Sequence, residues 1–223
     1  MKKLVSIFLC AAMLFSLAAC ADNSNEAEKE TTNEGTKDYL VLDEGRISVV
    51  SMENISGLFV EQGKQDEVEN VVALIVRNNS EKMLEYGVIS FRVNEFERAD
   101  FKISALPAGE SVIVMETLAR SYSEEDKYVI DYSVNQTYFS YTDASVDSEK
   151  AELSIDGSEI SVMNLTDSAL NATVVYKYFK DGMYYGGIAF RGSFEKIAAG
   201  ETMSKSSSRF NDTDCKIVNL ITE

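Results

Sequence analysis

The sequence predicts an all-β fold made of two tandem β-sandwich modules. From about residue 38 onward, short runs rich in Val, Ile, Tyr, Phe and Thr alternate with polar turn clusters, a pattern typical of β-sandwiches. A sustained period of 3.6 residues is hard to find, so few helices are expected. Two short sequence landmarks also return later in the chain, which indicates that one module has been duplicated.

The expected strands form two series. The strands of the first series cover residues 47–52, 71–77, 87–93, 99–104, 111–117 and 128–134. The strands of the second series cover residues 159–163, 172–179, 184–190, 202–208 and 216–221. A polar stretch at 143–150 separates the two series, so we expect a first module at 38–145 and a second at 146–223. A smaller domain buries a smaller fraction of its surface on folding, so the smaller second module should pack against the first.

The two landmarks define the proposed repeat. Asn78-Asn79-Ser80 returns as Asn164-Leu165-Thr166 at an offset of 86 residues, and the Pro-Ala-Gly-Glu turn in 106–111 returns at 197–202 at an offset of 91. The larger second offset indicates an insertion in the second copy, between its central strand and its Gly-Glu turn. The inserted stretch is expected at 183–187.

The start of the chain has the order of a secretory signal. Lys2 and Lys3 precede residues 4–19, which are apolar apart from two serines, and the chain turns polar after Cys20. This apolar run is shorter than the roughly 20 residues that a membrane-spanning helix needs. It is therefore expected to be removed rather than to remain as a membrane span.

The signal ends in a sequence that resembles the bacterial lipobox, Leu17-Ala18-Ala19-Cys20. Small side chains suit a narrow peptidase site, and only cysteine supplies the thiolate nucleophile to which a diacylglyceryl group is joined. We therefore expect residues 1–19 to be a lipoprotein signal peptide and Cys20 to be the lipid attachment site. The lipid would hold the chain on the extracytoplasmic face of the bacterial cell membrane. Residues 20–37 contain no large apolar residue and are expected to form a flexible acidic tether.

The chain is strongly acidic, with 21 Lys and Arg against 37 Asp and Glu and a formal net charge of −16. Loss of Lys2 and Lys3 with the signal leaves 19 basic side chains and a formal charge of −18. Such a surface repels phosphate backbones and anionic headgroups, so we expect no nucleic acid as a partner. Association with the membrane has to come from the lipid.

The composition also excludes several chemistries. No histidine is present, which removes Ser-His-Asp and Cys-His catalysis and His-ligated metal sites. Cys10 leaves with the signal and Cys20 takes the lipid, so Cys215 is the one thiol that remains, and its place in a strand-like run suggests a structural role. Gly186-Gly187 is an isolated pair and not a phosphate-binding loop. We therefore predict no catalytic residue, no metal site and no cofactor, while catalysis by carboxylates alone stays open.

Four features of the second module resemble a known family. They are Asn164-x-Thr166, the aromatic strand Tyr176-Lys177-Tyr178-Phe179, the turn Lys180-Asp181-Gly182, and Ala199-Gly200-Glu201. They are similar to the Ig-like modules, named for a Phe-x-Leu-Tyr-Asp pentapeptide, that occur in lipoproteins of Gram-positive bacteria. In this chain aromatic and Asp-Gly elements stand in place of the pentapeptide. The resemblance implies an Ig-like sandwich without enzymatic activity.

The inserted stretch holds the candidate contact residues, Tyr184 and Tyr185. Adjacent residues of a strand point to opposite faces, so one of the two tyrosines should point away from the core. An outward tyrosine beside glycines suits contact with a glycan or a protein, whereas the simpler alternative is pairing across strands or at the module interface. Acidic groups near the module boundary leave a calcium site as an alternative to a solvated linker; these are Asp143, Asp147, Glu149 and Asp156.

The leading functional hypothesis is a lipid-anchored, non-enzymatic binding or structural protein with an extracellular protein or glycan partner. A second hypothesis is an envelope enzyme or sugar-processing accessory that uses Asp and Glu alone, which requires a cleft with two carboxylates. The third is a scavenger or inhibitor of cationic proteins, suggested by the net charge.

Overall fold

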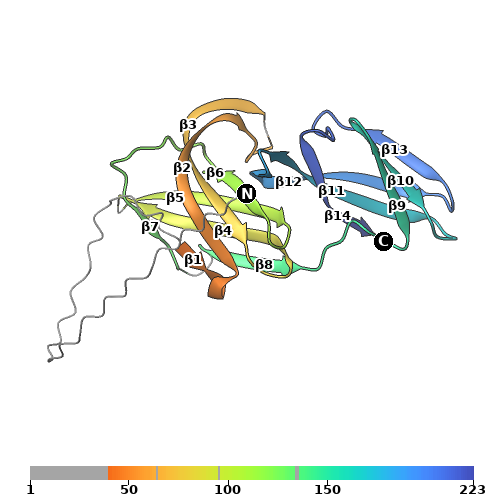
Figure 1. The fold of residues 1–223 in the computed structure, drawn as a ribbon, viewed down its shortest axis with the longest axis horizontal. Helices are drawn as coiled ribbons and strands as arrows, with labels where there is room; N and C mark the ends of the chain where they lie inside the picture. Colours follow the sequence, from red (N-terminus) through yellow and green to blue (C-terminus); the bar gives the residue numbers. More distant parts are fainter. Residues whose placement is uncertain (1–39, 64, 95, 134–135) are drawn as a thin grey trace, which may run out of the picture. The chain divides into compact units, whose positions relative to one another are not determined.

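The computed structural model describes residues 40–63, 65–94, 96–133 and 136–223, which belong to one compact unit (Figure 1). The signal peptide, the lipobox, Cys20 and the tether lie outside the described residues. Within these ranges the chain forms strands and one short 3-10 segment, η1 (Asp43–Gly45), so the predicted all-β fold is confirmed.

The first half of the chain contains β1 (Leu40–Leu42), β2 (Ile47–Phe59), β3 (Asp66–Asn78), β4 (Met83–Val93), β5 (Glu97–Leu106), β6 (Ser111–Met115), β7 (Tyr128–Ile130) and β8 (Tyr138–Thr142). The second half contains β9 (Ala151–Asp156), β10 (Glu159–Asn164), β11 (Leu170–Lys180), β12 (Met183–Ile197), β13 (Thr202–Ser206) and β14 (Cys215–Thr222). Each strand expected from the sequence overlaps one of these. β1, β8 and β9 were not among the expected strands. β1 has only three residues, and β9 alternates Ala, Leu and Ile with Glu, Ser and Asp directly after the polar stretch at 143–150.

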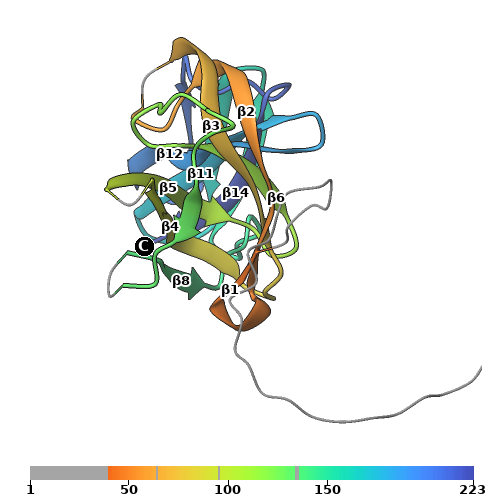
Figure 2. The same ribbon diagram turned by 90° about the vertical axis from the view of Figure 1, so that its left-hand side faces the viewer.

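The strands form three sheets. A seven-stranded sheet has the order β1-β2-β3-β6-β12-β11-β14, and a three-stranded sheet has the order β13-β10-β9. The third sheet has the order β5-β4-β7, with β8 also paired to β4. β2 and β3 run together as a long curved hairpin, seen from two sides in Figures 1 and 2.

The same pairing pattern occurs in both halves of the chain. β3 lies between β2 and β6, as β10 lies between β9 and β13. β4 lies between β5 and β8, as β11 lies between β12 and β14. Among the described residues, one strand pairing joins the two sets: the start of β12 pairs in parallel with β6, Tyr184 opposite Val112. The seven-stranded sheet therefore contains strands from both halves.

Two buried asparagines hold equivalent turns. The side-chain amide of Asn78 donates to the carbonyls of Lys82 and Leu106, and that of Asn164 donates to the carbonyls of Ser168 and Ile197. In each copy the asparagine Oδ1 accepts bonds from the backbone N–H and the hydroxyl of the residue two positions later. Gly109 and Gly200 donate their N–H to the carbonyls of the same asparagines. The landmarks found in the sequence thus occupy matching positions in the fold.

Replacing either Asn78 or Asn164 with alanine is expected to lower the free energy of unfolding by about 2 kcal/mol, because buried carbonyls lose their donors. The two losses should be similar, since the shorter carbonyl contacts are shared and the additional bond from Asn78 to the carbonyl of Pro107 is long, at 3.2 Å. The exposed Asn54, which bonds only the side chain of Asn70, gives a control whose replacement should cost less than about 0.5 kcal/mol. Urea denaturation measures all three variants, and unequal losses at 78 and 164 would contradict the equivalence of the two turns.

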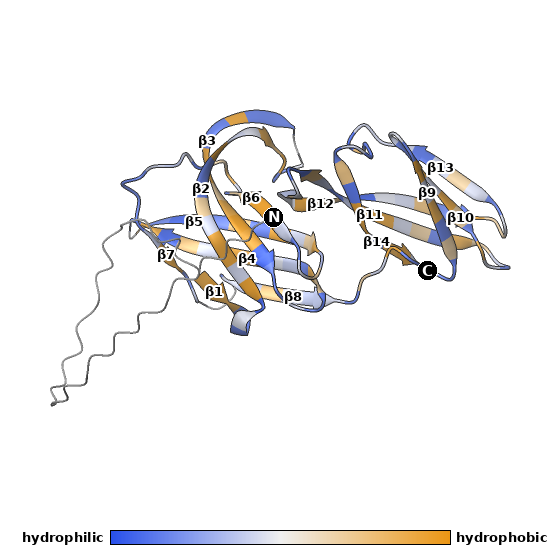
Figure 3. Cartoon of the chain, viewed as in Figure 1, coloured by the Kyte–Doolittle hydropathy of each residue, from blue (hydrophilic) through white to orange (hydrophobic). Residues whose placement is uncertain are grey.

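The buried side chains explain why the two halves form one unit. Hydrophobic residues concentrate along strands such as β4 and β14 (Figure 3). Val174 and Tyr176 of β11 pack in a cluster with residues of β9, β10 and β12, whereas their neighbour Val175 belongs to the cluster of the first half. Tyr184 and Val218 belong to that first cluster as well. Both faces of β11 are therefore buried.

Candidate binding cleft

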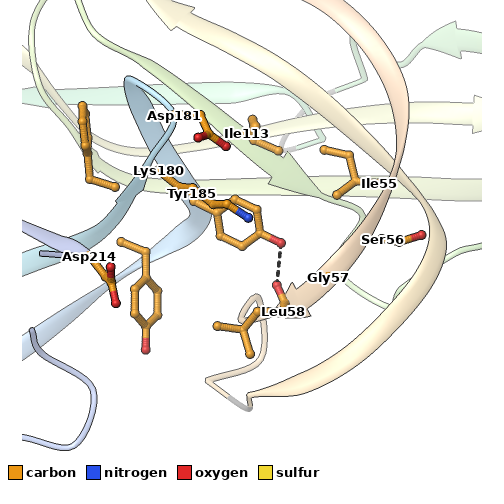
Figure 4. A pocket seen from close by; sticks show the side chains of 11 residues that line it. Ile55, Ser56, Gly57, Leu58, Ile113, Lys180, Asp181, Tyr185 and Asp214 are labelled. Atoms are coloured by element: carbon orange, nitrogen blue, oxygen red, sulfur yellow. Dashed lines mark hydrogen bonds between the residues drawn. The ribbon is translucent and has the colours of Figure 1, made fainter.

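A cleft of about 510 Å³ lies between the distal end of β2 and the β11–β12 hairpin (Figure 4). This volume is within the range of small-ligand sites in proteins. The residues that line it are Ile55, Ser56, Gly57, Leu58, Ile113, Tyr178, Phe179, Lys180, Asp181, Tyr185 and Asp214. One wall is the uncharged backbone and side chains of β2, and the other carries two carboxylates and one ammonium group.

The hairpin wall is formed by residues 178–181 and by Tyr185, which belongs to the stretch expected at 183–187. Asp181 and Gly182 have φ angles of +51° and +85°, which suit the tight turn between β11 and β12. β12 is 15 residues long, whereas β5, its counterpart in the first half, has 10. The pairing of β12 with β11 shifts between Tyr176 and Tyr178, where residues 186–189 stand opposite a single residue, so much of the additional length follows Tyr185. The start of β12 reaches β6 and lines the cleft through Tyr185.

The two candidate tyrosines have different environments. Tyr184 is only 5% exposed and packs edge-on against Phe179, with ring centroids 5.3 Å apart. Tyr185 is half-buried in the cleft, where its hydroxyl donates to the carbonyl of Leu58 at 2.8 Å. Burial raises the pKa of each phenol to about 12, so both are neutral at ordinary pH. Of the pair, Tyr185 is the one that a ligand in the cleft would touch.

A buried carboxyl group contacts two of the strands that line the cleft. Glu61, which follows β2, is 9% exposed and accepts bonds from the N–H groups of Met115 at 2.9 Å and Gly187 at 2.8 Å. Met115 belongs to β6 and Gly187 to β12, so one side chain joins β2, β6 and β12. This contact fixes the wall of the cleft formed by β2 to the strand that carries Tyr185.

A buried ammonium group lies on the other side of Gly187. Lys177 is fully buried, and its Nζ donates to the carbonyls of Ser104 at 2.9 Å, Gly187 at 3.0 Å and Ile188 at 2.9 Å. All three of its donors are therefore satisfied. Ser104 belongs to β5 of the first half, so Lys177 also joins strands from the two halves.

Burial shifts both groups toward their neutral forms. The pKa of Glu61 is raised to about 7 by burial, although the N–H groups of Met115 and Gly187 and the charge of Lys177 oppose the shift. The pKa of Lys177 is lowered by burial, and the charge of Glu61 opposes that shift. No direct ion pair between the two is found in the described residues, so their attraction acts across the backbone of Gly187.

The raised pKa of Glu61 predicts a pH-dependent stability. A carboxyl group whose pKa is higher in the folded than in the unfolded state binds more protons in the folded state. Its contribution to the free energy of unfolding is therefore present below pH 4.5 and is lost as the pH rises through about 7. The unfolding free energy of the wild type minus that of Glu61→Gln should therefore fall between these two pH values. Urea denaturation across this range measures the difference, and a constant difference would contradict the burial of a titrating carboxyl.

The cysteine and the acidic residues singled out in the sequence do not line the cleft. Cys215 is buried at the start of β14, where burial raises the pKa of its thiol, and its Sγ donates to the carbonyl of Arg209. Asp143 pairs with Lys82 at 3.1 Å. Within the described ranges, no three side chains of the types that bind metals gather closely enough to hold an ion. The same part of the chain has no helix of the length and apolar character needed to cross a bilayer.

Sequence reasoning did not single out Glu61 or Lys177. A lysine flanked by tyrosines in an apolar strand suggests an outward side chain when only one strand face is buried. One feature of the sequence indicated that Lys177 is buried: Val175, Lys177 and Phe179 form a second, mostly apolar face of the same strand. Comparisons with protein-family models, with curated proteins and with solved structures found no match to this chain.

Proposed function

We propose that this chain is a lipid-anchored extracytoplasmic protein that binds a ligand in the cleft between β2 and the β11–β12 hairpin. The cleft is the observation that carries the proposal, because it combines a ligand-sized volume with apolar walls and a few charged groups. The lipobox sequence at 17–20 supports the anchor. The partner class is an extracellular protein or a glycan.

The proposal includes a duplicated Ig-like module. The recurring strand pairing and the two asparagine turns support duplication, and the motifs shared with the FxLYD-type modules support the Ig-like assignment. In this proposal the second copy acquired extra residues at the start of β12. These residues supply Tyr185 and part of the cleft wall, so the site depends on both copies.

Binding is tested with washed envelope material and purified wall glycan. The full chain should bind one of these, and Tyr185→Ala should weaken binding about tenfold, consistent with loss of an aromatic contact residue. Tyr138→Ala is the matched control, because Tyr138 is 43% exposed and lies outside the cleft. Equal binding by the wild type and Tyr185→Ala, with both folded, would show that the cleft is not the site.

The anchor is tested separately. Cys20→Ala is expected to release the protein from membranes into the soluble fraction, because the polar acidic chain has no other means of membrane attachment in this proposal. Membrane fractionation of the two forms measures this. Retention of Cys20→Ala that requires detergent for release would contradict the lipid anchor.

A second candidate function has one observation in its favour. Asp181 and Asp214 both line the cleft, so the two carboxylates required by a carboxylate-based enzyme or sugar-processing accessory are present. Turnover of wall glycan by the wild type that is lost in both Asp181→Asn and Asp214→Asn, with binding retained, would favour this candidate. Binding without turnover in all three proteins would favour the binding protein.

A further inference from the structure

Within the part of the chain that the structure describes, one edge of β2 has no strand neighbour over most of its length. β1 pairs only with residues 47–49 of β2, and β3 occupies the opposite edge. On the side away from β3, the rest of β2 has no strand neighbour among the described residues. The edge of β3 that faces away from β2 is covered near Asn70 and Val72. The N–H of Val72 donates to the carbonyl of Arg120, and the N–H of Tyr122 donates to the carbonyl of Asn70. The edge of β2 therefore presents backbone donors and acceptors on which another strand can pair.

The regular part of this edge has defined ends. Register shifts interrupt the pairing of β2 with β3 between Val49 and Ser51 and between Ile55 and Gly57. Between them, residues 51–55 keep an uninterrupted register. Because bulges end regular pairing, an added strand would pair along this short stretch and then meet the cleft.

The distal end of the same strand forms one wall of the cleft. Ile55, Ser56, Gly57 and Leu58 lie opposite Lys180, Asp181 and Asp214 (Figure 4). The carbonyl of Leu58 accepts a hydrogen bond from Tyr185, whose ring lies in the cleft, so a backbone acceptor of β2 already faces this space. A segment that continues past residue 55 would enter between apolar side chains such as Ile113 and Phe179.

The charges around this surface favour a basic segment. Glu53 is exposed within the regular stretch of the edge, and two carboxylates stand against one ammonium group in the cleft lining. Opposite charges on facing strands stabilise pairing, whereas like charges oppose it. The net charge of −16 would also attract a cationic chain from a distance.

We infer that residues 51–55 of β2 and the cleft together bind a short extended peptide segment that carries basic and apolar residues. The segment pairs with the free edge of β2 as an additional strand, places an apolar side chain in the cleft, and sets its basic side chains against Glu53, Asp181 and Asp214. Backbone pairing gives affinity in this mode of recognition, and the alternate side chains give selectivity. This inference depends on the proposed function, since it names the ligand class of the same cleft.

The test uses the full chain with ¹⁵N labels and three synthetic probes. The first is acetyl-Lys-Val-Tyr-Val-Lys-amide, the second has Glu in place of both Lys, and the third is the basic peptide N-methylated at both Val. The basic peptide should shift the backbone amide signals of residues 51–58, and added salt should weaken its binding. The acidic and the N-methylated peptides should each bind at least about tenfold more weakly, because they lose charge complementarity or backbone donors.

Two double variants test whether the carboxylates of the cleft attract the basic peptide. Asp181→Asn with Asp214→Asn should weaken binding of the basic peptide about threefold to tenfold, a typical loss for partly exposed ion pairs. Asparagine tolerates the positive φ of residue 181, so this variant should keep the turn. Asp167→Asn with Asp212→Asn is the matched control, since both residues are exposed and neither lines the cleft.

Each contrary outcome has a separate meaning. Shifts outside β2 and the cleft, or equal binding of the N-methylated peptide, would overturn strand pairing. Equal binding of the acidic peptide would overturn the basic ligand class. If no peptide binds but a wall glycan binds in a Tyr185-dependent way, the inference fails and the proposed function stands. If neither binds, both fail.

Discussion

Gly187→Ala is expected to lower the free energy of unfolding by about 3 kcal/mol or more, the upper range for forced overpacking. A Cβ atom at this position would lie 1.9 Å from the carbonyl oxygen of Lys102, 2.8 Å from Val114 Cγ2 and 2.9 Å from Glu61 Oε2. The first of these is backbone, which cannot rotate away as a side chain can. The strand must therefore shift, and the bonds that Glu61 and Lys177 make to Gly187 are weakened with it.

Another glycine of the same strand provides the control for Gly187→Ala. A Cβ at Gly192 would meet only Phe194 Cε2 at 3.7 Å, an ordinary contact, so Gly192→Ala should change stability by less than about 0.5 kcal/mol. Chemical denaturation of the wild type and both variants measures the difference. A loss below about 1 kcal/mol for Gly187→Ala would mean that β12 and β5 can separate cheaply, and that their close approach is not needed for the fold.

Lys177→Met should cost about 3 kcal/mol or more, because three buried carbonyls lose the group that donates to them. Methionine keeps the apolar stem but leaves the carbonyls of Ser104, Gly187 and Ile188 without their donor. It also leaves the Glu61 carboxylate without the favourable charge that opposes its desolvation. Lys102→Met, which changes an exposed lysine on β5, should have little effect.

The double variant Lys177→Met with Glu61→Gln separates the energetic coupling between the two side chains from the loss of unfolding free energy that each single variant causes. If the two side chains stabilise each other's charged forms, the double variant should lose less than the sum of the single losses. A loss equal to the sum would show that each side chain acts only through its own hydrogen bonds, and a greater loss would contradict mutual stabilisation. Thermal or urea unfolding of the four proteins provides the cycle.

Strand locations were predictable because β-branched and aromatic runs bounded by polar turns are a signal that can be found in the local sequence. The extents were less predictable. β2 and β3 continue through Glu53, Asn54 and Glu67, which lack β propensity, because each strand gives the other its backbone hydrogen bonds. The paired Asn and Gly landmarks were predictable for a different reason: a buried turn needs a side chain that both donates and accepts.

The candidate site was only partly predictable, because the sequence pattern assumes that one face of each strand is buried. Under that assumption one of the two adjacent tyrosines was expected to point away from the core, and Lys177 was given no buried role. In the structure the first half of the chain covers the second face of β11 and buries Tyr184. Long-range packing of this kind joins residues such as Glu61 and Gly187, which are far apart in sequence, and leaves no periodic signal.

The parallel pairing of β6 with β12 also sets the order in which the chain can complete its fold. Val112 pairs with Tyr184, which is synthesised 72 positions later, so the outer edge of β6 waits without a strand partner until most of the chain has emerged. Such distant pairings close slowly, and the exposed edge is meanwhile available to other chains. The contact that unites the two halves is therefore among the last that the chain can form.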